Sequence, residues 1–153
     1  MKLFLVQHAE AKSAEVDASR GLTLRGATDA RKVAAHLQKI HLEVKHIHHS
    51  GKARAHETAA ILAEQLKPVK GITKAEGLGP QDDVEIWIER LKLLDEDVML
   101  IGHLPHLRRL AAVLLCGDPE KAVVHFRMGG VVSLMRTEDA WSLEWAITPE
   151  TVL

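Results

Sequence analysis

Apolar residues recur along the chain in two kinds of pattern, short continuous runs and longer stretches with helical spacing. The runs Leu3–Val6 and Val98–Gly102 are apolar throughout, which is typical of strands covered on both faces of a sheet. Between Thr23 and Ile40, apolar residues recur at helical spacing, which predicts a helix with Thr23 as its candidate N-cap. The other stretches with helical spacing are 53–66, 84–94 and 105–115, and weaker strand-like segments lie at 44–49 and 69–75.

The last third of the chain changes character and predicts strands alone. Segments 122–126, 131–136 and 141–147 are β-compatible, and the last two are separated by the short turn 137–139, so they are expected to pair as a hairpin. Strands that alternate with helices favour a parallel sheet with helices on both faces. We therefore predict a three-layer α/β/α fold with a mainly parallel sheet and an antiparallel C-terminal edge.

Composition agrees with one globular domain over residues 1–153, since 46% of the residues are hydrophobic. The formal net charge of −1 gives no overall field that would attract nucleic acid or an anionic membrane, and an aromatic content of 3% argues against base-stacking surfaces. Cys116 is the single cysteine, and neither a leader pattern nor a membrane-spanning run is found. We expect a cytoplasmic protein.

Histidines follow both of the fully apolar runs. His8 comes after Leu3–Val6, and His103 comes directly after Val98–Gly102. In open α/β sheets, ligands bind beyond the carboxyl ends of the strands. If both runs form central parallel strands, His8 and His103 meet at one edge of the sheet although they are 95 positions apart.

A third candidate component is the segment 50–58, which leaves another strand and opens a helix. The amide groups of a helix N-terminus, together with Arg54, suit an anion. Two imidazoles and a guanidinium beside a helix N-terminus form a set suited to phosphoryl transfer through a covalent phosphohistidine.

The sequence resembles the histidine phosphatase superfamily, and most closely its small branch typified by the SixA phosphohistidine phosphatase. The resemblance covers nearly the whole chain and has five motifs in the family's order. They are Leu5-Val6-Gln7-His8-Ala9-Glu10-Ala11, Leu22-Thr23-x-x-Gly26, Ser50-x-x-x-Arg54-Ala55-x-x-Thr58, Leu78-x-Pro80-x-Asp82 and Gly102-His103-Leu104-Pro105. It implies a phosphoglycerate mutase-like fold.

The resemblance also implies roles for single residues. His8 would be the nucleophile, and Arg54 and His103 would bind and stabilise the transferring phosphoryl group. Gln7, Ser50 and Leu104 would complete the phosphate-binding set, with no metal and no cofactor. The expected partner is a protein that carries phosphohistidine, or a small phosphorylated substrate; the sequence does not give the oligomeric state.

The sequence departs from the family within the first motif. Gln7 stands where the family has arginine, and Ala9 stands where it has glycine. A glutamine amide can donate a hydrogen bond to phosphate but carries no charge, and charge-assisted bonds are about twice as strong as neutral ones. Lys12, Lys52 and Arg108 are candidates to supply the missing charge.

Three carboxylates are candidate proton donors or acceptors, although each also suits a cap or a solvated loop charge. They are Glu10, Glu76 and Asp82. Without a clear acid, the site suits phosphohistidine, because its P–N bond is labile and the leaving imidazole can take a proton from solvent. Two other functions stay open: a catalytically weakened phosphate-binding or phosphoprotein-binding module, which Gln7 favours, and a phosphatase for small phosphate esters.

His46 and His48 lie two residues apart on a candidate strand and therefore face the same side. Such a pair can bind zinc or copper, but no cysteine or carboxylate stands nearby at ligand spacing. We interpret the pair as part of a half-exposed polar strand face.

Overall fold

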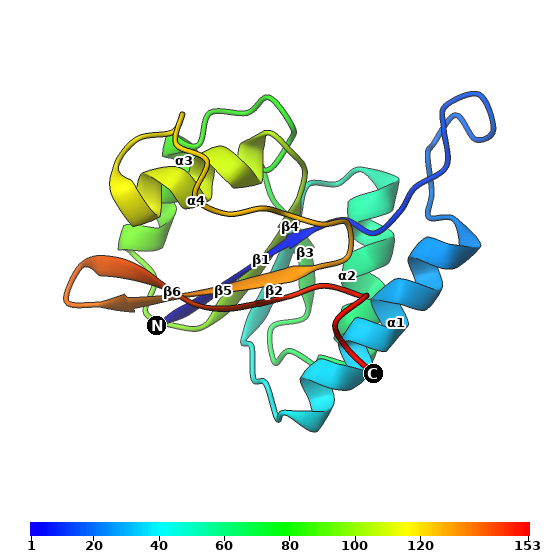
Figure 1. The fold of residues 1–153 in the computed structure, drawn as a ribbon, viewed down its shortest axis with the longest axis horizontal. Helices are drawn as coiled ribbons and strands as arrows, with labels where there is room; N and C mark the ends of the chain where they lie inside the picture. Colours follow the sequence, from blue (N-terminus) through cyan, green and yellow to red (C-terminus); the bar gives the residue numbers. More distant parts are fainter.

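The computed structural model describes residues 1–153 and shows one sheet with two pairs of helices (Figure 1). Helices α1 and α2 cover one face of the sheet, and α3 and α4 cover the other. None of the helices is long and apolar enough to cross a membrane. The elements are β1 Lys2–Gln7, α1 Leu24–Lys39, β2 His46–His49, α2 Ala53–Leu66, β3 Ile72–Lys74, α3 Glu85–Lys92, β4 Val98–Gly102, α4 His106–Cys116, β5 Val131–Thr137 and β6 Ala140–Ile147.

The six strands form one sheet in the order β3-β2-β4-β1-β5-β6. The first four of these are parallel, whereas β5 runs antiparallel to β1, and β6 runs antiparallel to β5. In the register of β1 on β4, Leu5 pairs with Leu100 and Gln7 pairs with Gly102. The expected fold class, a mainly parallel sheet with an antiparallel C-terminal edge, is confirmed.

Strand β1 lies at the centre of the molecule and contributes to both of its apolar layers. Phe4 and Val6 pack toward α1 and α2, whereas Leu3 and Leu5 pack toward α3 and α4. All four side chains are at most 2% exposed. The continuous apolar run therefore arises because successive side chains of this strand enter two different cores.

The predicted strand at 122–126 is wrong, because this segment forms no strand in the structure. Both edges of β1 are already taken, by β4 on one side and β5 on the other, so the segment has no central partner. It crosses the surface instead and buries Phe126 in the layer under α3 and α4. The hairpin that follows is confirmed, with Glu138 and Asp139 at its turn and both at positive φ.

The start of α1 is fixed by a cap and by a close approach of the backbone. Thr23 accepts a hydrogen bond from the amide of Gly26, as the sequence predicts for an N-cap. A Cβ atom on Gly26 would overlap the carbonyl oxygen of Glu10. Glycine is therefore required here, since it lets the chain leaving β1 pass directly against the helix.

Candidate active site

The backbone around His8 is tied to two neighbouring elements as it leaves β1. The amide of His8 donates to the carbonyl of Gly102 at 3.1 Å, which joins it to β4. The next amide, of Ala9, donates to the buried hydroxyl of Thr58 at 3.0 Å, and that hydroxyl donates to the carbonyl of Arg54 at 2.8 Å. The strand end therefore lies directly against the first turns of α2.

One hydrogen bond determines which nitrogen of His8 is free. Nδ1 lies 2.7 Å from the carbonyl oxygen of Ala9, and a carbonyl only accepts, so Nδ1 carries the proton. In the neutral ring, Nε2 then holds the lone pair. Burial lowers the pKa of His8, and the charges of Arg54 and Arg20 lower it further, against the bond to Ala9, which raises it. The imidazole is therefore neutral and nucleophilic at neutral pH.

His103 follows β4 and brings a second imidazole to the same place. The ring centroids of His8 and His103 are 5.0 Å apart, and His103 Nε2 shares a hydrogen bond of 2.6 Å with Ser50 Oγ. Burial, followed by the charges of His8, Arg54 and other nearby groups, lowers the pKa of His103 to about 3. A bound phosphoryl dianion would act in the opposite direction and raise it.

Two arginines contribute positive charge around these histidines: Arg54 acts on both rings, and Arg20 acts on His8. Arg54 opens α2, and its Nε atom is buried without a hydrogen-bond partner. Arg20 comes from the loop that precedes α1, and its positive charge lowers the pKa of both His8 and Arg54. The prediction from sequence missed Arg20, although its place just before the motif Leu22-Thr23-x-x-Gly26 was a usable signal. Lys52, one of the nominated cations, acts on His103.

The helix N-terminus at the site is open. Lys52 is the N-cap of α2 and makes no side-chain cap, so the amides of Ala53 and Arg54 have no acceptor within the helix, whereas that of Ala55 donates to the carbonyl of Lys52. The turn before it is held by His49, whose Nδ1 accepts from the amide of Gly51 at 3.1 Å. This arrangement suits an anion held between the start of α2 and the two imidazoles.

The three candidate carboxylates differ in what they contact. Glu10 Oε1 accepts from the hydroxyl of Thr23 at 2.9 Å, and Asp82 Oδ2 accepts from the amide of Gly79 at 2.8 Å. Glu10 therefore supports the start of α1, and Asp82 supports the turn at Gly79. Glu76 is held through its carbonyl, which accepts from the indole of Trp87. Glu76, Asp82 and Ser50 all line one groove of about 880 Å³.

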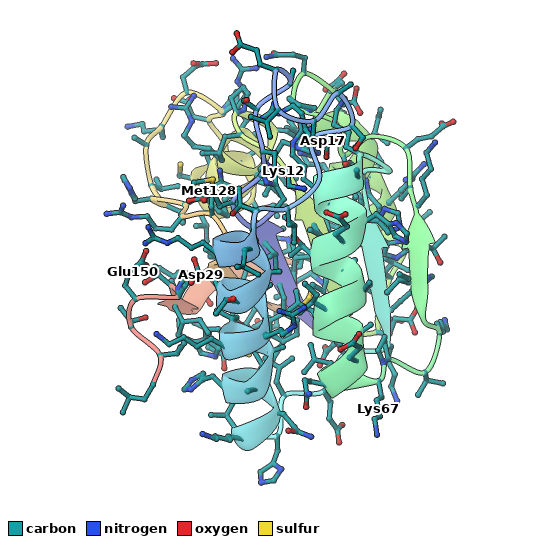
Figure 2. All side chains as sticks on the ribbon, turned by 90° about the vertical axis from the view of Figure 1, so that its right-hand side faces the viewer. Lys12, Asp17, Asp29, Lys67, Met128 and Glu150 are labelled. Carbon is teal, nitrogen blue, oxygen red and sulfur yellow. The ribbon has the colours of Figure 1, made fainter.

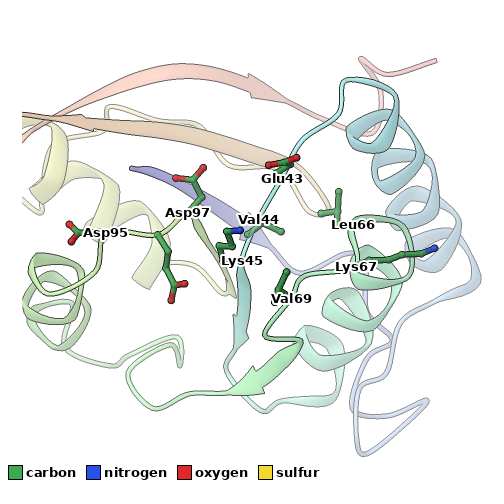
Figure 3. A pocket seen from close by; sticks show the side chains of 9 residues that line it. Glu43, Val44, Lys45, Leu66, Lys67, Val69, Asp95 and Asp97 are labelled. Carbon is green, nitrogen blue, oxygen red and sulfur yellow. The ribbon is translucent and has the colours of Figure 1, made fainter.

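A second cavity lies at the opposite end of the sheet, near the amino ends of β2 and β4 (Figure 3). It has a volume of about 470 Å³ and is lined mainly by charged side chains, among them Glu43, Lys45 and Asp97. None of the candidate site residues lines it.

Residues 3–79 match the model of the histidine phosphatase superfamily (branch 1). The chain belongs to this superfamily. Among curated relatives, an uncharacterized protein of Picosynechococcus sp. is 30% identical over 142 residues, which cover 88% of this chain and 84% of the relative. Membership supports a phosphatase activity for the chain.

Solved structures of the superfamily superpose on nearly the whole chain. The protein histidine phosphatase SixA in complex with tungstate has a TM-score of 0.87 at 25% identity, with 97% of each chain covered. The α-ribazole phosphatase from Shigella flexneri has a TM-score of 0.79 at 17% identity and shares the fold, with 94% of this chain and 95% of that chain covered. The expected phosphoglycerate mutase-like fold is confirmed.

The structure shows how the superfamily's first motif is accommodated with its two changes. Gln7 accepts a backbone bond from Gly129 at 2.9 Å, and its side-chain Oε1 is buried without a partner. Ala9 is fully buried, and its φ is not positive, so the backbone does not need glycine there. Leu104, named as a phosphate-binding residue by resemblance, follows His103 and is 37% exposed.

Histidines outside this pair also make defined contacts; among them His106, on α4, lies near enough to His103 to lower its pKa. His46 and His48 stack on one strand face with ring centroids 4.0 Å apart, and the edge of Trp87 contacts His48. No group of three or more histidine, cysteine or acidic side chains could hold a metal ion. The ring of His56 on α2 lies 4.9 Å, centroid to centroid, from that of His49 at the end of β2.

Proposed function

We propose that the protein is a phosphatase that hydrolyses phosphohistidine on another protein through a covalent phosphohistidine at His8. The observation that carries this proposal is the state of His8. Its Nδ1–H donates a hydrogen bond to the carbonyl of Ala9, and its free Nε2 belongs to a ring whose centroid is 5.0 Å from that of His103. The charges of Arg54 and Arg20 act on this ring.

The reaction then has two displacements at phosphorus. His8 Nε2 donates its lone pair to phosphorus, the P–N bond to the substrate imidazole breaks, and that nitrogen takes a proton from solvent. Water attacks the phosphorylated His8 next, which releases inorganic phosphate and restores the neutral imidazole. A loose phosphoryl transition state mainly needs position and fixed positive charge, and Arg54, Arg20 and the open start of α2 provide both.

The leaving group is the reason for choosing phosphohistidine. An alkoxide needs a general acid, whereas the imidazole of a P–N bond does not. Glu10 and Asp82 use their carboxylates in local hydrogen bonds with Thr23 and Gly79. Likeness to SixA, named as a protein histidine phosphatase, supports the same substrate class.

A second candidate is a phosphatase for small phosphate esters. It is favoured by the groove beside Ser50, which has room for a compact organic group and contains Glu76 as a candidate proton donor. Likeness in fold to an α-ribazole phosphatase is compatible with it. A weakened binding module, which the uncharged Gln7 favours, is the third reading.

The test is incubation of the protein with a histidine peptide phosphorylated by phosphoramidate and, separately, with p-nitrophenyl phosphate. His8→Ala is the inactive variant, and His125→Ala is its matched control because His125 is exposed and distant in sequence from every motif. We expect release of phosphate from the peptide, an acid-labile phosphoryl label on the wild type, and no label on His8→Ala.

Each other outcome contradicts the leading proposal in its own way. Equal turnover by wild type and His8→Ala would exclude the covalent mechanism. A clear preference for the aryl ester would favour the second candidate, and phosphate binding without turnover would favour the module.

A further inference from the structure

The two ends of the loop that carries Arg20 lie side by side. Ala11 and Leu22 form an isolated antiparallel bridge, and the amide of Lys12 donates to the carbonyl of Gly21 at 2.9 Å. Figure 2 shows Lys12 and Asp17 above the adjacent ends of α1 and α2. Loop 12–22 therefore projects over the start of the helix that bears Arg54.

Inside loop 12–22, the carboxylate of Asp17 fixes the local conformation. Its oxygens accept from the amide and hydroxyl of Ser19 and from the amide of Gly21 at 2.8 to 3.0 Å. Arg20 is held at a positive φ of 53°, and its Nε donates to the carbonyl of Lys12 at 3.1 Å. These bonds shape the loop, but they all lie within it and do not fix its position over α2.

The position comes from Glu57, one turn after Arg54 on α2. Its Oε2 accepts from the amide of Leu22 at 2.6 Å, which joins the loop to the helix. A Cβ atom on Gly21 would lie 3.0 Å from Glu57 Oε1, so the carboxylate closes directly on the loop backbone. A carboxylate that accepts from a backbone amide makes a charge-assisted bond, about twice as strong as a neutral one.

We propose that Glu57 is a positioning residue that sets the place of Arg20 beside His8 and Arg54 by anchoring loop 12–22 to α2. This inference rests on the proposed function at His8. The hydrogen bond between Glu57 and Leu22 joins two segments that each carry an arginine. Glu57 lies three residues after Arg54, and Leu22 lies two residues after Arg20.

The role predicts a pH effect with a definite sign. The charged or titratable groups that act on His8 are Arg54 from α2, Arg20 from the loop and His103 from the end of β4. If the anchor is lost, Arg20 moves away, and the pKa of His8 rises because one of the charges that lowers it is weakened. Removal of the negative charge of Glu57 alone would act oppositely and lower that pKa.

The experiment measures kcat/KM for the phosphohistidine peptide from pH 5 to pH 9 in four proteins. Wild type is compared with Glu57→Ala, with Glu57→Gln, whose amide oxygen can still accept from Leu22, and with Glu64→Ala. Glu64 is an exposed glutamate on the same helix and is the matched control. Amide hydrogen exchange over residues 12–22 is measured in the same proteins, which reports on the loop without reference to activity.

We expect Glu57→Ala to lower kcat/KM about 10-fold to 10²-fold, the size of effect that a misplaced catalytic group produces. Its acid limb should move to higher pH, and exchange at Leu22 should speed up. Glu57→Gln should keep kcat/KM and the exchange at Leu22 near wild type, and its acid limb should not move to higher pH, because only the charge is lost. Glu64→Ala should match wild type in all three measurements.

Two results would overturn the inference. One is unchanged exchange over 12–22 in Glu57→Ala, and the other is faster exchange without loss of kcat/KM or movement of the acid limb. A wild type that turns over no phosphorylated substrate would instead reject the proposed function, and the exchange data would still show whether Glu57 anchors the loop.

Discussion

At the scale of single residues, the site depends on where positive charge is placed around a neutral imidazole. Gln7 removes a cation from the position next to His8, yet Arg20 acts on His8 from the loop before α1. His8 and His103 could be predicted because both follow recognisable buried strands. Arg20 was missed, because its place depends on a loop that folds back through hydrogen bonds and has no periodic pattern in the sequence; its only signal was its position just before the motif that begins at Leu22.

Arg20→Gln tests whether Arg20 replaces the positive charge that is lost at Gln7. We expect kcat for the phosphohistidine peptide to fall about 10²-fold, as when one preorganised donor is removed from a transition state. Gln7→Arg in the Arg20→Gln background should recover part of the loss, because it returns a cation to the strand end. Arg31→Gln, which changes an exposed arginine of α1, is the control. An unchanged kcat in Arg20→Gln would show that Arg20 is dispensable.

At the scale of elements, the hydrophobic pattern predicted all four helices and the four parallel strands with small differences at their ends. The strand β3 is shorter than the predicted segment 69–75, and Pro105 precedes α4 as its N-cap. The error at 122–126 has a different cause. Ala122–Phe126 has β-compatible residues, but pairing is decided by which sheet edges are free, and that depends on the whole topology.

Gly26→Ala, in the first turn of α1, is expected to destabilise the protein, although the same change inside a helix is usually stabilising. Replacing glycine by alanine inside a helix normally stabilises it by about 1 kcal/mol. Here the new methyl would overlap the carbonyl of Glu10, so we expect the free energy of unfolding to fall by about 2 to 3 kcal/mol. Urea denaturation measures the change, with Thr28→Ala on the exposed side of α1 as control. A more stable Gly26→Ala protein would contradict the close approach.

At the scale of the whole molecule, the fold keeps an ionisable side chain neutral by burying it just beyond the end of β4. The side chain of His103 is 2% exposed, and its pKa is lowered from 6.5 to about 3 in the folded protein. Above pH 6.5 it is neutral both folded and unfolded, so it has no effect on the pH dependence there. Below that pH the unfolded chain takes up a proton that the folded protein does not, and stability falls until pH reaches about 3.

The expected contribution of His103 at pH 5 is a loss of about 2 kcal/mol in the free energy of unfolding. Thermal unfolding of wild type and His103→Gln should therefore diverge between pH 7 and pH 5, with a smaller decrease in Tm for the variant. His125→Gln, at an exposed position, should follow wild type. Parallel curves for wild type and His103→Gln would mean that His103 is protonated as easily in the folded protein as in the unfolded chain.

The register of β1 on β4 also limits how this protein can be re-engineered. Deleting one residue within Lys2–Gln7 would exchange the side chains that enter the two cores and would withdraw His8 from His103 in the same step. The length of β1 therefore cannot be changed without disturbing both the cores and the site. A designer who wants a different substrate range should change the length of loop 12–22 or of the segment 75–83, because neither lies within a strand or a helix.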